Sequence, residues 1–95
     1  MFKELNPLLH SELRLGVMSI LISVDSADFT YIRKQTGATA GNLSVQLDKL
    51  SQAGYITIEK SFSGKMPRTT CRVTKEGLKA FQEYVEALQS YIARK

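Results

Sequence analysis

Residues that build catalytic and metal sites are scarce in this chain. Its 95 residues include one cysteine, Cys71, and one histidine, His10, which lie in different segments. A single cysteine excludes an internal disulfide and a zinc site made of several cysteines. The sequence also has no glycine-rich phosphate-binding loop and no constellation of carboxylates. We therefore expect no enzyme, no cofactor and no metal, and we interpret His10 as a surface or boundary residue.

A long hydrophobic run is also missing. The most apolar stretch, residues 16–24, is too short to span a bilayer and contains two serines. Glu12 and Arg14 precede it, in place of the basic leader of a signal peptide. We interpret this stretch as a buried helix. Together with the single cysteine, its character predicts a cytoplasmic protein.

Acidic residues are absent from one segment, residues 60–75. The whole chain has a formal net charge of +4 and a pI near 9.4, which suits a polyanionic partner but does not identify one. The segment contains five basic residues, namely Lys60, Lys65, Arg68, Arg72 and Lys75. A charge excess comparable to that of the whole chain is therefore confined to this segment.

Nothing in the sequence suggests more than one domain. There is no internal repeat, low-complexity tract or linker, and the hydrophobic fraction of 43% is ordinary for a globular protein. The length is near the lower end of sizes that build a stable core. We predict a single domain over residues 1–95, with an N-terminal arm at 1–10 and a C-terminal helix at 74–95.

Residues 36–56, TGATAGNLSVQLDKLSQAGYI, have the pattern of a helix-turn-helix. Gly37 ends a short helical pattern, and Thr39 stands at the N-cap of the next helix, which Gly54 ends. The apolar stripe of this second helix consists of Leu43, Leu47, Leu50 and Ala53, and its opposite face carries Gly41, Asn42, Val45, Gln46 and Lys49.

The polar face of the second helix is suited to contact DNA. Asn42 and Gln46 carry amides that can form bidentate hydrogen bonds with base edges, chiefly adenine. Ser44 and Lys49 are candidates for holding phosphates. The alternative is an ordinary amphipathic helix whose polar face is only hydrated.

The segments before this motif predict two more helices. Ser11 is the N-cap candidate of the first one. Its buried face consists of Leu13, Val17, Ile20 and Leu21, widened by Leu15, Met18 and Ile22. Phe29 is expected in a short extended piece. Asp28 or Thr30 then caps a brief helix that ends at Gln35.

A β-hairpin is predicted after the helix-turn-helix. The strands at 55–62 and 68–73 alternate with period two and flank a turn at 63–67, SGKMP, which contains glycine and proline. The basic segment covers the tip and the return strand. Cys71 is expected to pack inward as a small hydrophobe, in preference to acting as a redox sensor.

The last helix, with Thr74 as its N-cap candidate, has an apolar seam without an evident partner. The seam steps by three and four residues through Leu78, Phe81, Val85, Leu88 and Ile92. Only the first turns of so long a helix are expected to rest on a small domain, and exposing the remainder costs about 25 cal/mol per Å². A second copy of the chain is the expected partner. The alternative is a helix that folds back and frays at its end.

The arm carries much apolar surface for a chain end. Leu5 and Leu8 lie on either side of Asn6 and Pro7, which suit the cap and first position of a short helical turn. The arm either folds back on the core or packs on a second subunit. We assign Leu5 and Leu8 to the predicted dimer interface.

Three stretches together resemble one family. RLGVMSIL (14–21), the helix-turn-helix above and MPRTTCRVTKEGLKAF (66–81) are similar to the MarR-type winged-helix transcriptional regulators. The likeness is strongest to the short archaeal and bacterial branch, which has a bare winged helix and one C-terminal helix. It implies an α+β, mostly helical fold with a three-helix core, a β-hairpin wing and a long C-terminal helix.

The resemblance also implies a homodimer that binds double-stranded DNA at a pseudo-palindromic site and regulates transcription. The second helix of the motif would enter the major groove, and the wing would reach a minor groove or phosphates. The matching positions are Thr39, Gly41, Asn42, Ser44, Val45, Gln46 and Lys49 on the recognition helix, and Lys65 and Arg68 at the wing. The wing lacks the aspartate that braces the wing arginine in larger relatives.

Other properties of the family find no match here. Larger relatives hold a phenolic ligand beside a helical dimerisation domain, for which this chain has only short terminal helices. Metal-sensing relatives use cysteine pairs or histidine and aspartate clusters that this sequence lacks. The alternative function is a winged helix that binds an acidic protein surface without sequence-specific DNA binding.

Overall fold

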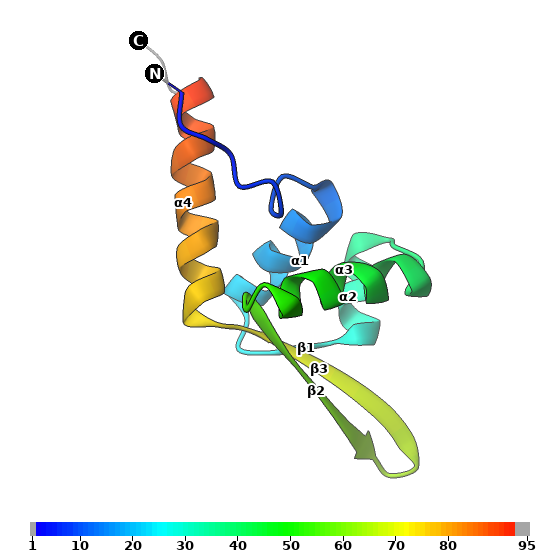
Figure 1. Cartoon of the computed structure of the whole chain (residues 1–95). Helices are drawn as coiled ribbons and strands as arrows, with labels where there is room; N and C mark the ends of the chain where they lie inside the picture. The colour runs from blue at the N-terminus through cyan, green and yellow to red at the C-terminus, as the bar shows by residue number, and fades with distance from the viewer. Residues whose placement is uncertain (1, 93–95) are drawn as a thin grey trace.

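The computed structural model describes residues 2–92, which form four α-helices and three β-strands. In chain order these are α1 (Glu12–Ser23), β1 (Ala27–Asp28), α2 (Phe29–Thr36), α3 (Ala40–Gln52), β2 (Ile56–Ser63), β3 (Met66–Val73) and α4 (Lys75–Ile92). The strands form one antiparallel sheet in the order β1-β3-β2. The β2–β3 hairpin and α4 project from the three-helix body in different directions (Figure 1). The predicted winged helix-turn-helix with a long C-terminal helix is confirmed.

Each helix begins at a side chain that accepts a hydrogen bond from a free backbone N–H. The acceptors are Ser11 from Arg14 at 3.4 Å, Asp28 from Tyr31 at 2.8 Å, Thr39 from Asn42 at 3.2 Å and Thr74 from Gly77 at 2.9 Å. Such caps typically stabilise a helix by about 1 kcal/mol. The choice left open for α2 is settled in favour of Asp28, because Thr30 already lies within the helix.

The prediction for Phe29 was wrong. The extended piece is Ala27–Asp28, and Phe29 is the first residue of α2. This piece pairs with β3, with Ala27 opposite Cys71 and Asp28 opposite Thr70. A strand of two residues is too short to show a period, so the sequence predicted a hairpin where the structure has a three-stranded sheet.

The hairpin is longer and its turn shorter than predicted. The two strands pair from Ile56–Val73 to Ser63–Met66, which leaves Gly64 and Lys65 as a two-residue turn. Gly64 adopts a φ of 67°, which glycine tolerates without strain. Pro67 lies within β3, at a position that β1 does not reach. The missing N–H of proline therefore costs no hydrogen bond between β1 and β3.

The core lies between α1, α2, α3 and one face of the sheet. Its fully buried members include Leu9 from the arm and Val17, Met18, Leu21, Ile32, Leu43, Leu50, Ile56 and Cys71. Burial raises the pKa of the Cys71 thiol to about 11. The prediction that Cys71 packs inward is confirmed, since its side chain is wholly buried. No helix within residues 2–92 has the length and apolarity to cross a membrane.

The N-terminal arm folds back along α4 (Figure 1). Near the end of the helix, Phe2 stacks on Tyr91 with ring centroids 4.5 Å apart, and the Lys3 N–H donates to Ser90 Oγ at 3.1 Å. Nearer the body, His10 Nδ1 and the Tyr84 hydroxyl share a hydrogen bond of 2.9 Å. The arm therefore supplies α4 with packing partners that the sequence alone did not predict.

One face of α4 is buried within the same chain over most of its length. The buried residues are Gly77, Ala80, Tyr84 and Ala87. The expectation that only the first turns of α4 rest on the fold was wrong, because Tyr84 and Ala87, farther along the helix, are buried as well. The predicted seam lies beside this buried face, not on it.

Gly77 permits the first turn of α4 to approach the β2 entry closely. A Cβ atom at this position would lie 2.1 Å from the Tyr55 carbonyl oxygen. The Thr74 hydroxyl donates to the Gly54 carbonyl at 2.6 Å in the same corner. This close contact fixes where α4 leaves the body, and only a residue without a Cβ can occupy the position.

Candidate nucleic-acid interface

The outer face of α3 carries the largest group of predicted site residues that lie together in the structure. Thr39, Gly41, Asn42, Ser44, Val45 and Lys49 are exposed, and Gln46 is half-buried. The opposite face, formed by Leu43, Leu47 and Leu50, is buried in the core. This division follows from the sequence, because the apolar positions recur at the helical period. The helix can therefore offer polar groups outward while its inner face holds it on the body.

The turn before α3 is formed as predicted. Gly37 has a φ of 72° and its N–H donates to the Arg33 carbonyl at 2.9 Å, which ends α2. The Arg33 side chain donates to the Ala38 carbonyl at 3.2 Å, across the same turn. Thr39 then caps α3. The two helices are thus joined by a short turn whose backbone groups are satisfied locally.

Gln46 is not simply hydrated. Its amide oxygen accepts a hydrogen bond from Arg14 Nη1 of α1, and its amide nitrogen donates to Asn42 Oδ1 at 3.0 Å. Arg14 Nε also donates to the Leu8 carbonyl at 2.6 Å. Arg14 was not predicted as a site residue, because its partner Gln46 lies 32 positions away and no local pattern reveals such a contact.

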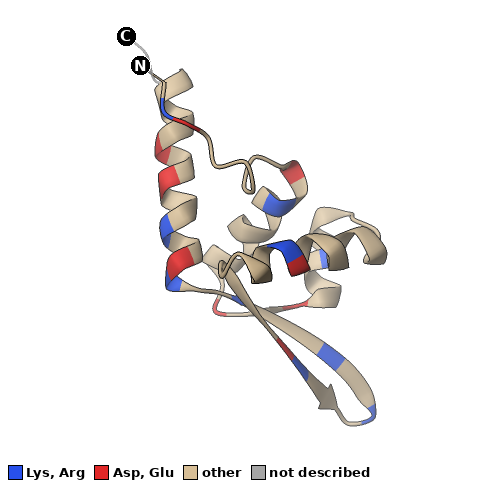
Figure 2. Ribbon diagram, in the orientation of Figure 1, with Lys and Arg blue, Asp and Glu red and all other residues tan. Residues whose placement is uncertain are grey.

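The two predicted wing residues lie near the tip of the hairpin. Lys65 is in the turn and Arg68 is on β3, and both are exposed. Figure 2 shows several Lys and Arg along the hairpin with one acidic residue, Glu59 of β2, whereas acidic residues recur along α4. The excess of basic residues therefore projects from the body at the end of a long, two-stranded ribbon.

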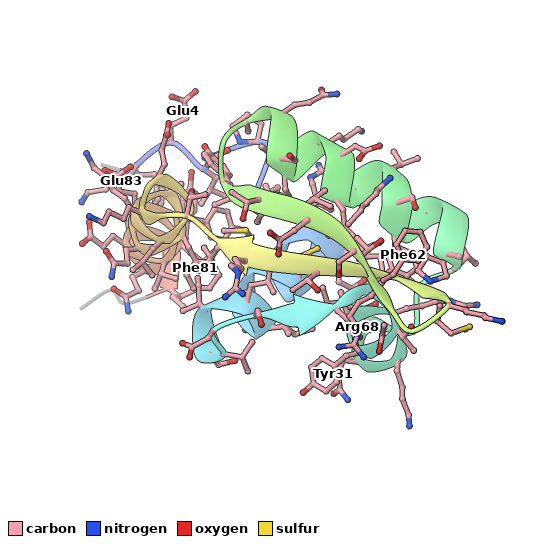
Figure 3. All side chains as sticks on the ribbon, turned by 90° about the horizontal axis from the view of Figure 1, so that it is seen from below. Glu4, Tyr31, Phe62, Arg68, Phe81 and Glu83 are labelled. Atoms are coloured by element: carbon pink, nitrogen blue, oxygen red, sulfur yellow. The ribbon has the colours of Figure 1, made fainter. Side chains whose placement is uncertain are left out.

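Arg68 lies on the side of the hairpin that faces α2. In Figure 3 it lies near Tyr31, whereas Phe62 lies on the side of α3. Arg68 lines a hollow of about 420 Å³ with Asp28, Phe29 and Met66, among others. The wing and the start of α2 thus border one groove.

Two large apolar side chains near the wing tip were not predicted as site residues. Phe62 is 75% exposed and Met66 is 70% exposed. Side chains alternate between the two faces of both strands as predicted. This end of the hairpin extends past the core, however, so the side chains of Phe62 and Met66 have no buried interior to pack into. Exposed apolar groups of this size among basic residues suit contact with another molecule.

The predicted dimer residues of α4 form a partly exposed stripe. Leu78 is 37% exposed and Ile92 is 71% exposed, while Phe81, Val85 and Leu88 between them are half-buried. Leu5 and Leu8 of the arm are half-buried against the core of the same chain. The stripe therefore remains available on a helix that has another face already covered.

The side chains that could bind a metal ion or act in catalysis lie apart from one another. Within residues 2–92, no three His, Cys, Asp or Glu side chains gather in the way that a metal ion requires. His10 is bonded to Tyr84, and Cys71 is buried. The features that the structure does assemble are surfaces, namely the polar face of α3, the basic hairpin and the apolar stripe of α4.

Comparisons with known proteins agree with this geometry. Residues 13–92 match the family model described as a winged helix DNA-binding domain. An uncharacterised protein of Methanocaldococcus jannaschii, MJ0432, is 30% identical over 81 residues, which covers 84% of this chain and 88% of that protein.

Solved structures show the same architecture. A transcriptional regulator homologue from Pyrococcus horikoshii OT3 superposes with a TM-score of 0.86 at 27% identity, covering 93% of this chain and 87% of that one. A mutant of MarR from E. coli, solved in complex with operator DNA, superposes with a TM-score of 0.74 at 15% identity, covering 92% and 61%. The chain therefore belongs to the winged helix DNA-binding domain family, has the fold of the MarR-type transcriptional regulators, and is a DNA-binding regulator and not an enzyme.

Proposed function

We propose that this protein is a homodimeric transcriptional regulator that recognises a specific double-stranded DNA site. The observation that carries the proposal is the two-faced helix α3, which buries Leu43, Leu47 and Leu50 and exposes a row of polar side chains. A helix of this kind fits the major groove, where each base pair offers a distinct pattern of donors and acceptors. The operator DNA bound by the E. coli MarR mutant supports DNA as the partner.

The basic wing would supply most of the affinity. Lys65 and Arg68 are exposed on a hairpin whose tip and return strand contain no acidic residue. Each phosphate that such a residue neutralises releases condensed counterions, which favours binding at low salt. Ser44 and Lys49 of α3 would add phosphate contacts. Asn42, Gln46 and Val45 would then select among sequences, the last through apolar contact with a thymine methyl group.

Two copies would associate through α4. The stripe of Leu78, Phe81, Val85, Leu88 and Ile92 is partly exposed and continuous along the helix, and Leu5 and Leu8 lie half-buried on the arm that follows the same helix. Covering apolar surface is favourable by about 25 cal/mol per Å². A two-fold axis would place the two α3 helices about 34 Å apart, on successive major grooves of a pseudo-palindromic site.

A cytoplasmic location fits this proposal. The cytoplasm keeps thiols reduced, and Cys71 is a lone, buried thiol with no partner for a disulfide in the chain.

The test is selection of bound sequences from random duplex DNA by the purified protein, together with sedimentation of the free protein. The expected result is an inverted repeat with half-sites one helical turn apart, and a dimer at micromolar concentration. A monomer that retains no particular sequence at low salt would contradict the proposal.

One observation favours a second function. Phe62 and Met66 are exposed apolar residues near the wing tip, as in surfaces that bind other proteins. A winged helix used as a protein-interaction module would bind an acidic protein surface through this hairpin. Gel shifts with the gene's own upstream DNA at two salt concentrations separate the two functions, since only the DNA-binding regulator shifts that DNA at low salt.

A further inference from the structure

Arg14 connects the arm to the polar face of α3. Its Nε donates to the Leu8 carbonyl at 2.6 Å, and its Nη1 donates to the amide oxygen of Gln46. Gln46 in turn donates from its amide nitrogen to Asn42 Oδ1 at 3.0 Å. Three side chains and one backbone carbonyl therefore form a single chain of hydrogen bonds that ends at an exposed residue of the recognition helix.

The direction of this chain follows from the chemistry of its first member. A guanidinium has only donors, so the Gln46 amide must turn its oxygen toward Arg14. The Gln46 nitrogen then faces Asn42, which must accept through its own oxygen. The Asn42 amide nitrogen, with two N–H groups, is left as the outward end. Reversing the Gln46 amide would turn its N–H groups toward the guanidinium and break a bond to a charged group, and reversing the Asn42 amide would place its N–H groups against those of Gln46.

The surroundings favour a fixed orientation. Arg14 and Gln46 are half-buried, and Asn42 is exposed. The guanidinium is held at two points, one on backbone and one on side chain, so it cannot rotate without losing one of them. Partial burial weakens competition from water for these hydrogen bonds. The amides are therefore oriented before any ligand arrives.

We propose that Arg14 is a positioning residue that makes the Asn42–Gln46 pair a hydrogen-bond donor toward DNA, and that the pair selects guanine. This inference rests on the proposed function. Guanine offers two acceptors, N7 and O6, on its major-groove edge, whereas adenine offers one acceptor and one donor. The bidentate adenine contact expected from the sequence needs an amide that presents oxygen and nitrogen together. The hydrogen-bond chain turns the oxygens of both amides toward protein partners.

The experiment compares the wild-type chain with Arg14→Met and Arg72→Met in selection from random duplex DNA. Both variants lose one positive charge by the same replacement, but Arg72 is exposed on β3 and takes no part in the chain of hydrogen bonds. The wild type and Arg72→Met are expected to favour guanine over adenine at one position of each half-site. In Arg14→Met the amides are free to turn, and this preference should fall about tenfold, which corresponds to loss of about 1.4 kcal/mol.

A second variant tests the inference at an exposed position, where a substitution is not expected to affect folding. Asn42→Asp changes an exposed side chain, retains the oxygen that accepts from Gln46 and replaces the outward donor with an acceptor. The expected preference then moves from guanine to cytosine, whose N4 amino group donates. Guanine retained by Asn42→Asp, adenine selected by the wild type, or equal preferences in Arg14→Met and Arg72→Met would each overturn the inference. A wild type that binds no duplex would instead remove the proposed function on which it rests.

Discussion

The β2–β3 hairpin and α4 are the two parts of this molecule that leave the body, and they expose opposite kinds of surface. The end of the hairpin carries the exposed side chains of Lys65 and Arg68 and projects from the three-helix body (Figure 1). The exposed stripe of α4 is apolar, and the helix is steadied on another face by the arm. The basic hairpin is therefore suited to bind a polyanion, whereas the apolar stripe of α4 is suited to pack against another apolar surface.

The comparison also shows that the two parts are anchored differently. The hairpin is held by its own ladder and by the short pairing of Ala27 and Asp28 with β3. The helix is held by a close backbone approach at Gly77 and by side-chain contacts such as Phe2 with Tyr91. Changes at the root of α4 should therefore disturb the fold more than changes at the hairpin tip.

Gly77→Ala should have the largest effect, because it tests the anchor of α4. The new methyl group would lie 2.1 Å from the Tyr55 carbonyl oxygen, so the helix must shift or the corner must open. We expect a loss of about 3 kcal/mol in the free energy of unfolding, at the upper end of overpacking effects. Thermal unfolding followed by circular dichroism measures it.

Gly41→Ala is the matched control. A Cβ at Gly41 meets nothing within 4 Å, and the residue lies in the first turn of α3. Alanine in place of glycine within a helix should stabilise the protein by up to about 1 kcal/mol. If both variants unfolded at the wild-type temperature, the close approach at the root of α4 would not be a constraint.

The double variant Leu78→Glu, Ile92→Glu tests the apolar surface of α4. Both side chains are exposed in the single chain, so the fold should persist, but four buried charges would oppose a two-fold interface. We expect a monomer in sedimentation and a loss of DNA affinity on the order of 100-fold, since only one half-site is then engaged. A dimer that survives both substitutions would mean that this stripe is not the interface.

Arg68→Ala tests the basic surface of the hairpin. Loss of one phosphate contact should reduce the slope of log K against log salt by about 0.9, which weakens binding about tenfold at low salt for all sequences alike. Lys79→Ala, on the exposed surface of α4, removes the same charge from the other region and should leave the slope unchanged. Equal salt slopes in the two variants would mean that the hairpin and α4 do not differ in their contacts with phosphates. Gel-shift titrations over a range of salt concentrations measure the slope.

The smallest effect concerns pH and Cys71. Burial raises the pKa of this thiol from 9.0 to about 11, so the folded state favours the protonated form more than the unfolded state does. This contribution to stability is fully present below pH 9 and is lost as the pH rises through 11. Cys71→Ala should therefore show a shallower decline in stability over this range, measured by urea unfolding. An identical decline in both proteins would show that other groups cause it.

The local features of the fold were predicted correctly from the sequence because they depend on neighbouring residues. The caps of three helices, the glycine at the end of α2 and the two faces of α3 each depend on residues within one or two turns of one another. The hairpin was placed correctly, but its turn was made too long because Pro67 suggested a break. A proline is compatible with a strand where the neighbouring strand is absent, and that absence is a property of the sheet, not of the segment.

Part of the site was predictable and part was not. The exposed row on α3 follows from helical spacing alone. The contact that orients Gln46 did not follow, because Arg14 comes from another helix and is itself held by the Leu8 carbonyl of the arm. The sequence therefore identified which side chains face outward but not which hydrogen-bonding groups they present.

The type of each element and the polar character of its surfaces follow from the sequence, since apolar periodicity, caps and the absence of acidic residues at 60–75 are properties of neighbouring residues. Packing of the whole chain sets which face of α4 the arm covers, leaves Phe62 and Met66 exposed and orients the amides of α3. Those outcomes depend on contacts between residues far apart in the chain, and such contacts are formed by packing, not by local propensity.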